Sequence, residues 1–283
     1  MPDIDLAPQF ANRTAVLATM HGKEQVIAPL LAELGITVIL PPKFDTDRFG
    51  TFSREVKRAG NQLEAARIKA TEAMQLTGCR LAIASEGAFG PHPALPYLPC
   101  NRELVLFIDH ELSQEPPLEI LGEAVSTATN FAQAQVSSLA EALEFAQTAE
   151  FPEHGLMLRV AEQWLKGITT EAELIRIVES ALASSPSVTL ETDMRACYNP
   201  KRMQVIRQAT ENLVQKIRQT CPHCGWPGFD IRERQSGLPC AWCGQPTELT
   251  QAVIYGCHRC DHQQVESSAA SQADPAYCAY CNP

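Results

Sequence analysis

The chain has 283 residues, of which 45% are hydrophobic, so it has room for one large domain with an appendage or for two domains of medium size. Its formal net charge of −10 includes no basic excess, which argues against a broad nucleic-acid-binding surface. The acidic start, "MPDIDLAPQF", lacks the apolar segment of a secretory signal, and no apolar run approaches the roughly 20 residues that span a membrane, so we expect a soluble cytoplasmic protein.

Apolar runs alternate with helical patterns along most of the chain. Short apolar runs predict strands at 14–20, 36–40, 80–85, 103–109, 155–160 and 187–193, with an extended segment at 118–129. Apolar residues that recur every three or four positions predict helices at 21–35, from Ser53 to about Leu76, and at 137–149, 170–184 and 200–219.

This alternation predicts an α/β fold with a mostly parallel, Rossmann-like sheet between two layers of helices. We expect the α/β domain to span residues 1–219, with a division into sub-lobes 1–150 and 151–219 left open. A small tandem zinc-ribbon domain is expected to span 220–283, where the cysteines gather.

Eight of the eleven cysteines form four Cys-x-x-Cys pairs, which we call knuckles 1 to 4 in chain order. The knuckles are Cys221–Cys224, Cys240–Cys243, Cys257–Cys260 and Cys278–Cys281. Zinc takes four tetrahedral ligands, and one Cys-x-x-Cys turn presents two thiolates to one ion. Closed sites with four sulfur ligands are structural, so the tail is predicted to hold two structural zinc ions.

Two pairings of the knuckles are open. In the sequential pairing, knuckles 1 and 2 bind one ion and knuckles 3 and 4 bind the other. In the interleaved pairing, knuckle 1 joins knuckle 3 and knuckle 2 joins knuckle 4. The matching sequences "CPHCG" and "CAWCG" resemble the two halves of one ribbon and favour the sequential pairing.

Polar residues follow nearly every predicted strand, and parallel α/β sheets bind ligands beyond the carboxyl ends of their strands. The candidate catalytic residues are His21, Lys23, Asp45, Asp47, Glu86, His92 and Asp109. The candidate ligand-binding residues are Arg48, Ser85, Gly87, Gly90, Glu191, Asp193 and Arg195. Together they could hold a divalent metal ion or a small anionic ligand; alternatively they are ordinary turn, cap and surface residues.

The segment 85–93, "SEGAFGPHP", is predicted to be a ligand loop that follows a strand. Two glycines allow its backbone amides to be exposed, and two prolines limit its freedom before a ligand binds. Glu86 and His92 would then face the same cavity as His21 and Asp45.

Five motifs together resemble a bacterial family, present in cyanobacteria among others, that is defined only as a domain of unknown function. They are "ATMHGKE", "DTDRFGTFSRE", "SEGAFGPHP", "LETDMRACYNPKRM" and "GLPCAWCGQPT". The resemblance spans most of the chain. It implies a bacterial cytoplasmic protein and assigns no chemistry.

Two functions of different classes are compatible with these features. In the first, the protein is an enzyme that acts on a small anionic substrate, phosphorylated or nucleotide-like, with His21 or His92 as general acid or base and Lys23 and Arg195 neutralising charge. In the second, the zinc ribbons dock a protein or nucleic acid, with nucleic acid disfavoured by charge. The aromatic residues of the tail would fill a partner's pocket, stack on bases or simply pack around zinc: Trp226, Trp242, Tyr255, Tyr277 and Tyr280.

Overall fold

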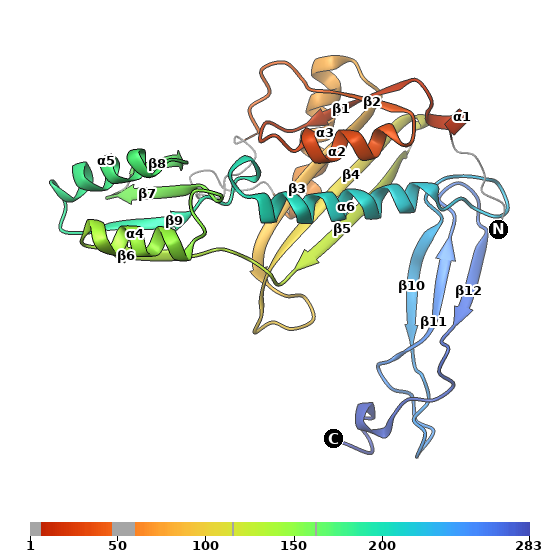
Figure 1. Ribbon diagram of the computed structural model, residues 1–283. Helices are drawn as coiled ribbons and strands as arrows, with labels where there is room; N and C mark the ends of the chain where they lie inside the picture. Colours follow the sequence, from red (N-terminus) through yellow and green to blue (C-terminus); the bar gives the residue numbers. More distant parts are fainter. Residues whose placement is uncertain (1–6, 47–59, 115, 162) are drawn as a thin grey trace. The chain divides into compact units, whose positions relative to one another are not determined.

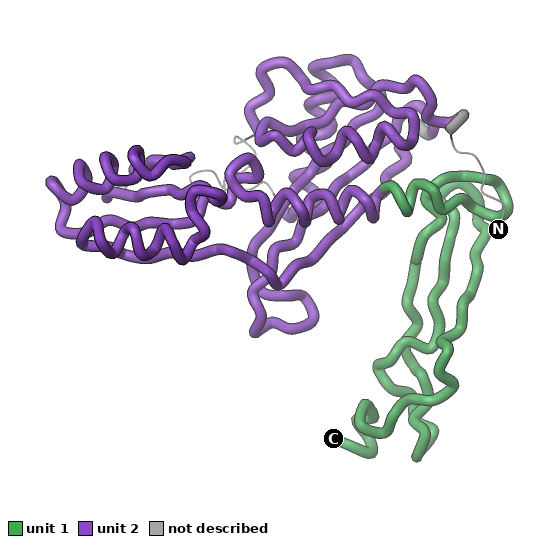
Figure 2. The backbone as a smooth tube through the Cα atoms, in the orientation of Figure 1, with its two compact units in different colours: residues 1–8, 214–283 green, residues 9–213 purple. Residues whose placement is uncertain are grey.

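The computed structural model describes residues 7–46, 60–114, 116–161 and 163–283. Asp47, Arg48 and the predicted helix start at Ser53 therefore lie outside the described residues. The chain divides into two compact units, a larger one of residues 9–213 and a cysteine-rich one of residues 1–8 and 214–283 (Figure 2). No helix in the described part of the chain is long and apolar enough to cross a membrane.

The larger unit contains a five-stranded sheet with the strand order β2-β1-β3-β4-β5 (Figure 1). Its strands are β1 (Arg13–Ala18), β2 (Ile36–Ile39), β3 (Leu81–Pro91), β4 (Pro99–Gln114) and β5 (Pro117–Ser126). The first three pair in parallel, but β4 and β5 are antiparallel to their neighbours. The prediction of a mixed α/β fold is confirmed, the prediction of a mostly parallel sheet is wrong, and a Rossmann-like arrangement is not confirmed.

The antiparallel part of the sheet explains the error. Seven residues, 92–98, connect β3 to β4, and this length suits a hairpin but not a helical crossover. The prediction that residues 85–93 form a loop after a strand is therefore wrong as well. Residues 85–91 belong to β3 and pair with β4 as far as Pro91, opposite Pro99.

Helix α3 (Gln62–Thr77) covers one face of this sheet with a row of alanines. It begins at Asn61, whose side chain accepts the N–H of Glu64 while the Glu64 carboxylate accepts the N–H of Asn61. It ends at Gly78, whose φ of 74° is the left-handed conformation that glycine adopts without strain. The small side chains of α3 allow it to lie close to β1, β3 and β4.

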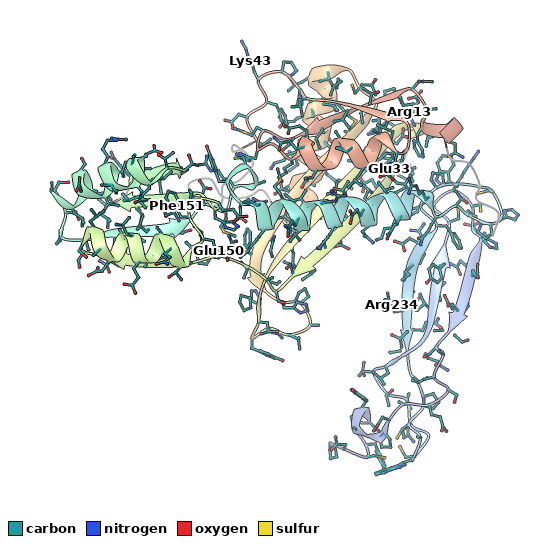
Figure 3. All side chains as sticks on the ribbon, viewed as in Figure 1. Arg13, Glu33, Lys43, Glu150, Phe151 and Arg234 are labelled. Atoms are coloured by element: carbon teal, nitrogen blue, oxygen red, sulfur yellow. The ribbon has the colours of Figure 1, made fainter. Side chains whose placement is uncertain are left out.

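Helices α2 (Glu24–Ala32) and α6 (Pro200–Arg218) run across the other side of the sheet in Figure 1. The close approach of α6 to β5 requires Gly122, because a Cβ atom there would lie 2.2 Å from the carbonyl oxygen of Ala209. The short helix α1 (Ala7–Phe10) adds Phe10, whose ring meets that of Phe107 edge to face, with 5.8 Å between the ring centres. Figure 3 shows the side chains, with Arg13 labelled at the start of β1.

A second, antiparallel sheet in the larger unit has the order β6-β9-β7-β8. Its strands are β6 (Gln133–Val136), β7 (Leu156–Val160), β8 (Gln163–Ile168) and β9 (Val188–Thr192). Helices α4 (Leu139–Thr148) and α5 (Glu171–Leu182) pack on it around a core that includes Leu158, Leu174 and Leu190. Strands β6 and β8 are not predicted from the sequence, because "QAQV" and "QWLKGI" show no sustained apolar pattern.

The cysteine-rich unit is built on the antiparallel sheet β10-β11-β12. The strands are β10 (Asp230–Ser236), β11 (Thr250–Gly256) and β12 (Gln263–Ser267). Each is followed or preceded by a knuckle, and most side chains of β10 and β12 are exposed. The described residues of this sheet therefore bury little apolar surface of their own.

Candidate functional site

The eight knuckle cysteines form two groups of four, and within each group the sulfur atoms lie within 4.8 Å of one another. Group 1 contains Cys221, Cys224, Cys257 and Cys260; group 2 contains Cys240, Cys243, Cys278 and Cys281. Among the described residues these are the only groups with a metal-binding arrangement.

The spacing of the sulfur atoms fits zinc. In group 1 the Sγ atoms of Cys224 and Cys257 are 3.6 Å apart, and in group 2 those of Cys243 and Cys278 are 3.7 Å apart. A tetrahedron with zinc–sulfur bonds of about 2.3 Å has edges of about 3.8 Å. A disulfide would need a sulfur–sulfur distance of about 2 Å. Both groups are therefore shaped for a tetrahedral zinc ion.

Local backbone geometry prepares the knuckles for this role. Gly225 and Gly244 follow knuckles 1 and 2 with φ of 69° and 73°, and their N–H groups donate to the carbonyls of Cys221 and Cys240 at 2.8 and 2.9 Å. In knuckle 3, burial raises the pKa of Cys257, but backbone N–H groups that point at its sulfur, together with hydrogen bonds from Cys224 and Cys260, outweigh burial and lower the pKa to about 7.

The observed pairing is interleaved, so the sequential pairing favoured by the sequence is wrong. The reason is the antiparallel sheet. Knuckle 1 precedes β10 and knuckle 3 lies between β11 and β12, which places both at one end of the three strands. Knuckle 2 follows β10 and knuckle 4 follows β12, at the opposite end. A strand of seven residues separates knuckles 1 and 2 by about 20 Å, too far to share one ion.

The aromatic residues of the tail divide between buried and exposed positions. Trp226 is buried beneath the guanidinium of Arg259, and Tyr255 stacks against Phe229. Trp242, Tyr277 and Tyr280 are exposed. Packing around the cysteine group thus accounts for the rings near group 1 but not for those of group 2.

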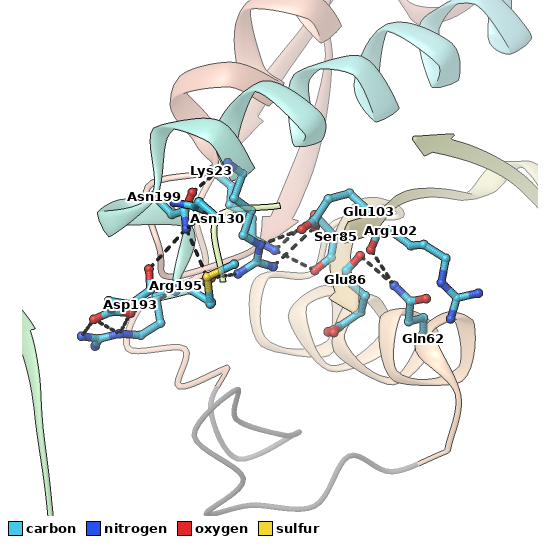
Figure 4. Close-up of polar contacts among 12 residues, drawn as sticks. Lys23, Gln62, Ser85, Glu86, Arg102, Glu103, Asn130, Asp193, Arg195 and Asn199 are labelled. Atoms are coloured by element: carbon cyan, nitrogen blue, oxygen red, sulfur yellow. Dashed lines mark hydrogen bonds and ion pairs between the residues drawn. The ribbon is translucent and has the colours of Figure 1, made fainter. Parts of the chain in front are cut away.

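In the larger unit, Lys23 and Ser85 meet beyond the carboxyl end of β1, beside the middle of β3 (Figure 4). The Lys23 side chain is 6% exposed, and its Nζ donates to the carbonyl oxygen and to Oγ of Ser85, both at 3.2 Å. Among the described residues, Lys23 makes no ion pair. Burial, and next the positive charge of Arg202, lower the pKa of Lys23 to about 7.

Arg202, near the start of α6, is the main site residue that the sequence reasoning missed. Its Nε donates to Oε1 of Glu103 on β4 at 2.6 Å, and its Nη1 donates to the carbonyl of Met194 at 2.6 Å. Both charged side chains of this pair are almost fully buried. Gly87 makes room for them, because a Cβ atom there would lie 2.4 Å from Arg202 and 2.5 Å from Glu103.

Glu86 faces the other side of the sheet from Ser85 and Gly87, since side chains alternate along a strand. It forms a buried ion pair with Lys69 of α3. The charge of Glu86 still favours the ammonium form of Lys23, though less than Glu103 does. Figure 4 shows Ser85, Glu86 and Glu103 as neighbours in this region.

Asp193 and Arg195 form a second polar cluster, after β9. The Arg195 guanidinium donates to the buried Asp193 carboxylate at 2.7 Å and lies over the ring of Tyr198 at 4.6 Å. Burial alone would lower the pKa of Arg195, but Asp193 outweighs it and raises the pKa. Asn199 caps α6 by accepting the N–H of Arg202 and donates to the Asp193 carbonyl, so the two clusters are connected.

The structure does not bring Asp109 to this region. Because β4 is antiparallel, Asp109 lies opposite Leu81 at the start of β3. Its buried carboxylate accepts two hydrogen bonds from Arg13, at 2.6 and 2.8 Å, and these bonds raise the pKa of Arg13. Glu103, at the other end of β4, reaches the region where Asp109 was expected.

The remaining predicted site residues are distributed along the larger unit. His92 sits in the β3–β4 connection, where its Nδ1 accepts the N–H groups of Ala94 and Leu95, as in a structural turn. His21 is half-buried and Asp45 is exposed. Gly90 pairs with Cys100 in the strand ladder and Glu191 lies in β9.

A family model described as "Domain of unknown function (DUF6671)" matches residues 69–283, most of the chain. The chain belongs to this family. No curated protein matches the sequence. The resemblance seen in the sequence is thereby confirmed at the level of the family.

The DUF6671 match begins at Lys69 and so includes both cysteine groups. It also includes the Glu86–Lys69 and Glu103–Arg202 pairs. Strand β1 and Lys23 lie before its first residue. The family assignment therefore covers the residues that surround Lys23 but not Lys23 itself.

Proposed function

We propose that this protein is a zinc-binding enzyme whose larger unit acts on a small anionic substrate, phosphorylated or nucleotide-like, beyond the carboxyl end of β1 and beside β3. The cysteine-rich unit holds two structural zinc ions in this proposal. The observation that carries the substrate assignment is Lys23, a buried ammonium without a carboxylate partner among the described residues.

The balance of buried charge supports an anion. Among the described residues, the charged groups that most affect Lys23 are Arg202, Glu103, Glu86 and Lys69. Glu86 pairs with Lys69 and Glu103 pairs with Arg202. Neither of these carboxylates forms an ion pair with Lys23, and an anion that bound there would supply the opposite charge. His21 and Gly22 beside it are only half-buried, so the ammonium lies close to the surface.

Lys23 also replaces His21 and His92 as the proposed acid or base. A lysine whose pKa is about 7 populates the amine and the ammonium at neutral pH, so it can accept or donate a proton there. No divalent metal ion forms part of the proposal, because no carboxylate–histidine group among the described residues has the arrangement for one.

Anion binding can be tested by the melting temperature of the full chain with inorganic phosphate, a nucleoside triphosphate or a sugar phosphate. At least one of them should raise the melting temperature, and Lys23→Met should abolish that rise. Lys201→Met is the matched control, because Lys201 pairs with Glu150 at a partly exposed site. The proposal fails if none of the anions has an effect at 10 mM, about tenfold above the upper end of ordinary KM values, or if Lys23→Met responds as the unmodified chain does.

An anion that binds can then be tested as a substrate. Incubation with the protein at pH 7, followed by phosphorus NMR, should show a new phosphorus signal that is absent with Lys23→Met. Binding without any conversion would make the site a sensor and would contradict the enzymatic part.

A further inference from the structure

Three aromatic rings project from the segments that carry group 2. Trp242 and Tyr280 are each 79% exposed, and Tyr277 is 64% exposed. Trp242 and Tyr280 occupy the same position within knuckles 2 and 4, directly before the last cysteine, and both knuckles belong to the same group. We call the surface formed by residues 237–249 and 273–283 the aromatic end.

The two segments of the aromatic end are joined to each other. The N–H of Ala241 donates to the carbonyl of Ala273 at 3.0 Å, and the N–H of Ala273 donates to the carbonyl of Pro239 at 2.8 Å. The Sγ atoms of Cys240 and Cys281 lie 3.9 Å apart. The three rings are therefore carried by one connected structure.

Zinc binding by a knuckle does not require exposed rings. The positions in group 1 that match Trp242 and Tyr280 carry His223 and Arg259. Large aromatic side chains normally bury much of their surface, and Trp226 near group 1 does so. Their exposure at the aromatic end needs another explanation, such as a partner that covers them.

The charge of the aromatic end indicates the chemistry of that partner. Residues 237–249 and 273–283 contain Glu248 and Asp274 but neither lysine nor arginine. Four thiolates and one Zn²⁺ ion add a net charge of −2, a step that depends on the zinc binding proposed above. Nucleic acid would be repelled, whereas a cationic side chain is attracted both by the charge and by the faces of the rings.

We propose that the aromatic end is a docking surface for a lysine- or arginine-bearing segment of another protein. Cationic side chains of that segment would stack on Trp242, Tyr277 and Tyr280, and the negative zinc centre held by the same two knuckles would favour their approach. Such contacts do not need a deep pocket.

The test uses the full, zinc-loaded chain and a fluorescein-labelled peptide of alternating arginine and glycine. Fluorescence anisotropy should show binding that Trp242→Ala/Tyr280→Ala weakens at least tenfold. Tyr97→Ala is the matched control, because Tyr97 is 77% exposed in the β3–β4 connection of the other unit, and it should leave binding unchanged. Absence of binding to the unmodified chain, or equal binding by the double variant, would overturn the proposal.

Parallel measurements separate the other occupants. A labelled glutamate–glycine peptide and a 12-nucleotide oligo(dT) should bind at least tenfold more weakly; tighter binding of oligo(dT) would overturn the proposal in favour of nucleic acid. A dimer in analytical ultracentrifugation that Trp242→Ala/Tyr280→Ala dissociates would assign the surface to a second copy and overturn it too. Metal analysis should find two zinc ions in both the unmodified chain and the double variant, which distinguishes lost docking from failure of the zinc assignment.

Discussion

The two units both hold ionisable groups away from solvent, but they neutralise them differently. In the larger unit the chain supplies both signs of charge, as in the buried pair of Arg202 with Glu103. In the cysteine-rich unit Cys221, Cys240 and Cys278 are buried among other cysteines. If these cysteines bind a metal ion as thiolates, that ion supplies the positive charge. We therefore expect the larger unit to stay folded without a metal ion and the cysteine-rich unit to need zinc.

Removal of zinc should give the largest effect and should affect the two units unequally. Structural zinc ions contribute about 10–16 kcal/mol each to the folding of small domains, and the described core of the cysteine-rich unit is small. After treatment with a strong chelator, hydrogen exchange should show that β10, β11 and β12 lose protection while β3 and β4 keep theirs. Equal loss in both units, or protection retained in both, would contradict the comparison.

The interleaved pairing predicts which cysteine substitutions remove the same ion. Cys224→Ala/Cys257→Ala changes group 1 twice and should leave one zinc ion per chain in native mass spectrometry. Cys224→Ala/Cys243→Ala changes both groups and should leave none after passage over a chelating resin. A sequential pairing would reverse these two results, so the pair of variants decides between them.

Arg202→Leu tests the larger unit, in which the chain supplies both charges of a buried ion pair. It leaves the Glu103 carboxylate, 1% exposed, buried without its partner, and should lower the free energy of unfolding by about 3–5 kcal/mol. Arg207→Leu removes a guanidinium from the same helix, but its pair with Glu211 is exposed and should change stability by less than about 1 kcal/mol. Urea unfolding followed by hydrogen exchange of β4 measures both.

A second variant separates the effect of an unpaired buried charge from that of lost packing. Arg202→Met/Glu103→Leu removes both charges and should regain most of the lost stability. A buried ion pair often stabilises a protein no more than apolar residues of similar volume do. If the double variant is as unstable as Arg202→Leu, the ion pair is not the cause.

Most helices and strands of the larger unit were predictable, but the direction of β4 was predicted wrongly. Its apolar pattern predicts a strand in either direction, and the error displaced Asp109 and hid Glu103. The seven-residue connection from β3 was the available signal, since a parallel crossover needs about a dozen residues. Arg202 could not have been predicted, because its partner is 99 residues away in the sequence.

For the cysteine-rich unit, ligand identity was predictable and ligand pairing was mispredicted. The Cys-x-x-Cys spacing reflects local geometry, which a sequence shows directly. Pairing depends on which ends of the strands meet. The runs "DIRERQS" and "TQAVIYG" between knuckles are long enough to be strands, and an antiparallel meander sends alternate knuckles to opposite ends.

Lys23 differs from the paired buried charges of the larger unit, because it makes no ion pair among the described residues, and Lys23→Met tests this difference. The pKa of Lys23 is about 7 in the folded chain, against an ordinary value of 10.5. Below pH 7 both the folded and the unfolded chain hold the proton, and the cost of burying the ammonium is present in full. Between pH 7 and 10.5 the unfolded chain binds more protons than the folded one, so this cost falls as the pH rises.

Lys23→Met should therefore stabilise the protein most at pH 6, and the gain should shrink between pH 7 and 10. At about 1.4 kcal/mol per pKa unit the cost is at most about 5 kcal/mol, and the lost hydrogen bonds to Ser85 offset about 1–2 kcal/mol of the gain. The expected gain is about 3 kcal/mol at pH 6, measured by urea unfolding followed by circular dichroism. Lys69→Met should instead destabilise at pH 7, because it removes a cation that pairs with the buried Glu86 carboxylate. A gain from Lys23→Met that does not change with pH would show that the pKa of Lys23 is not lowered, and a loss of stability would show that Lys23 is neutralised by a partner; either result would contradict the uncompensated charge on which anion binding depends.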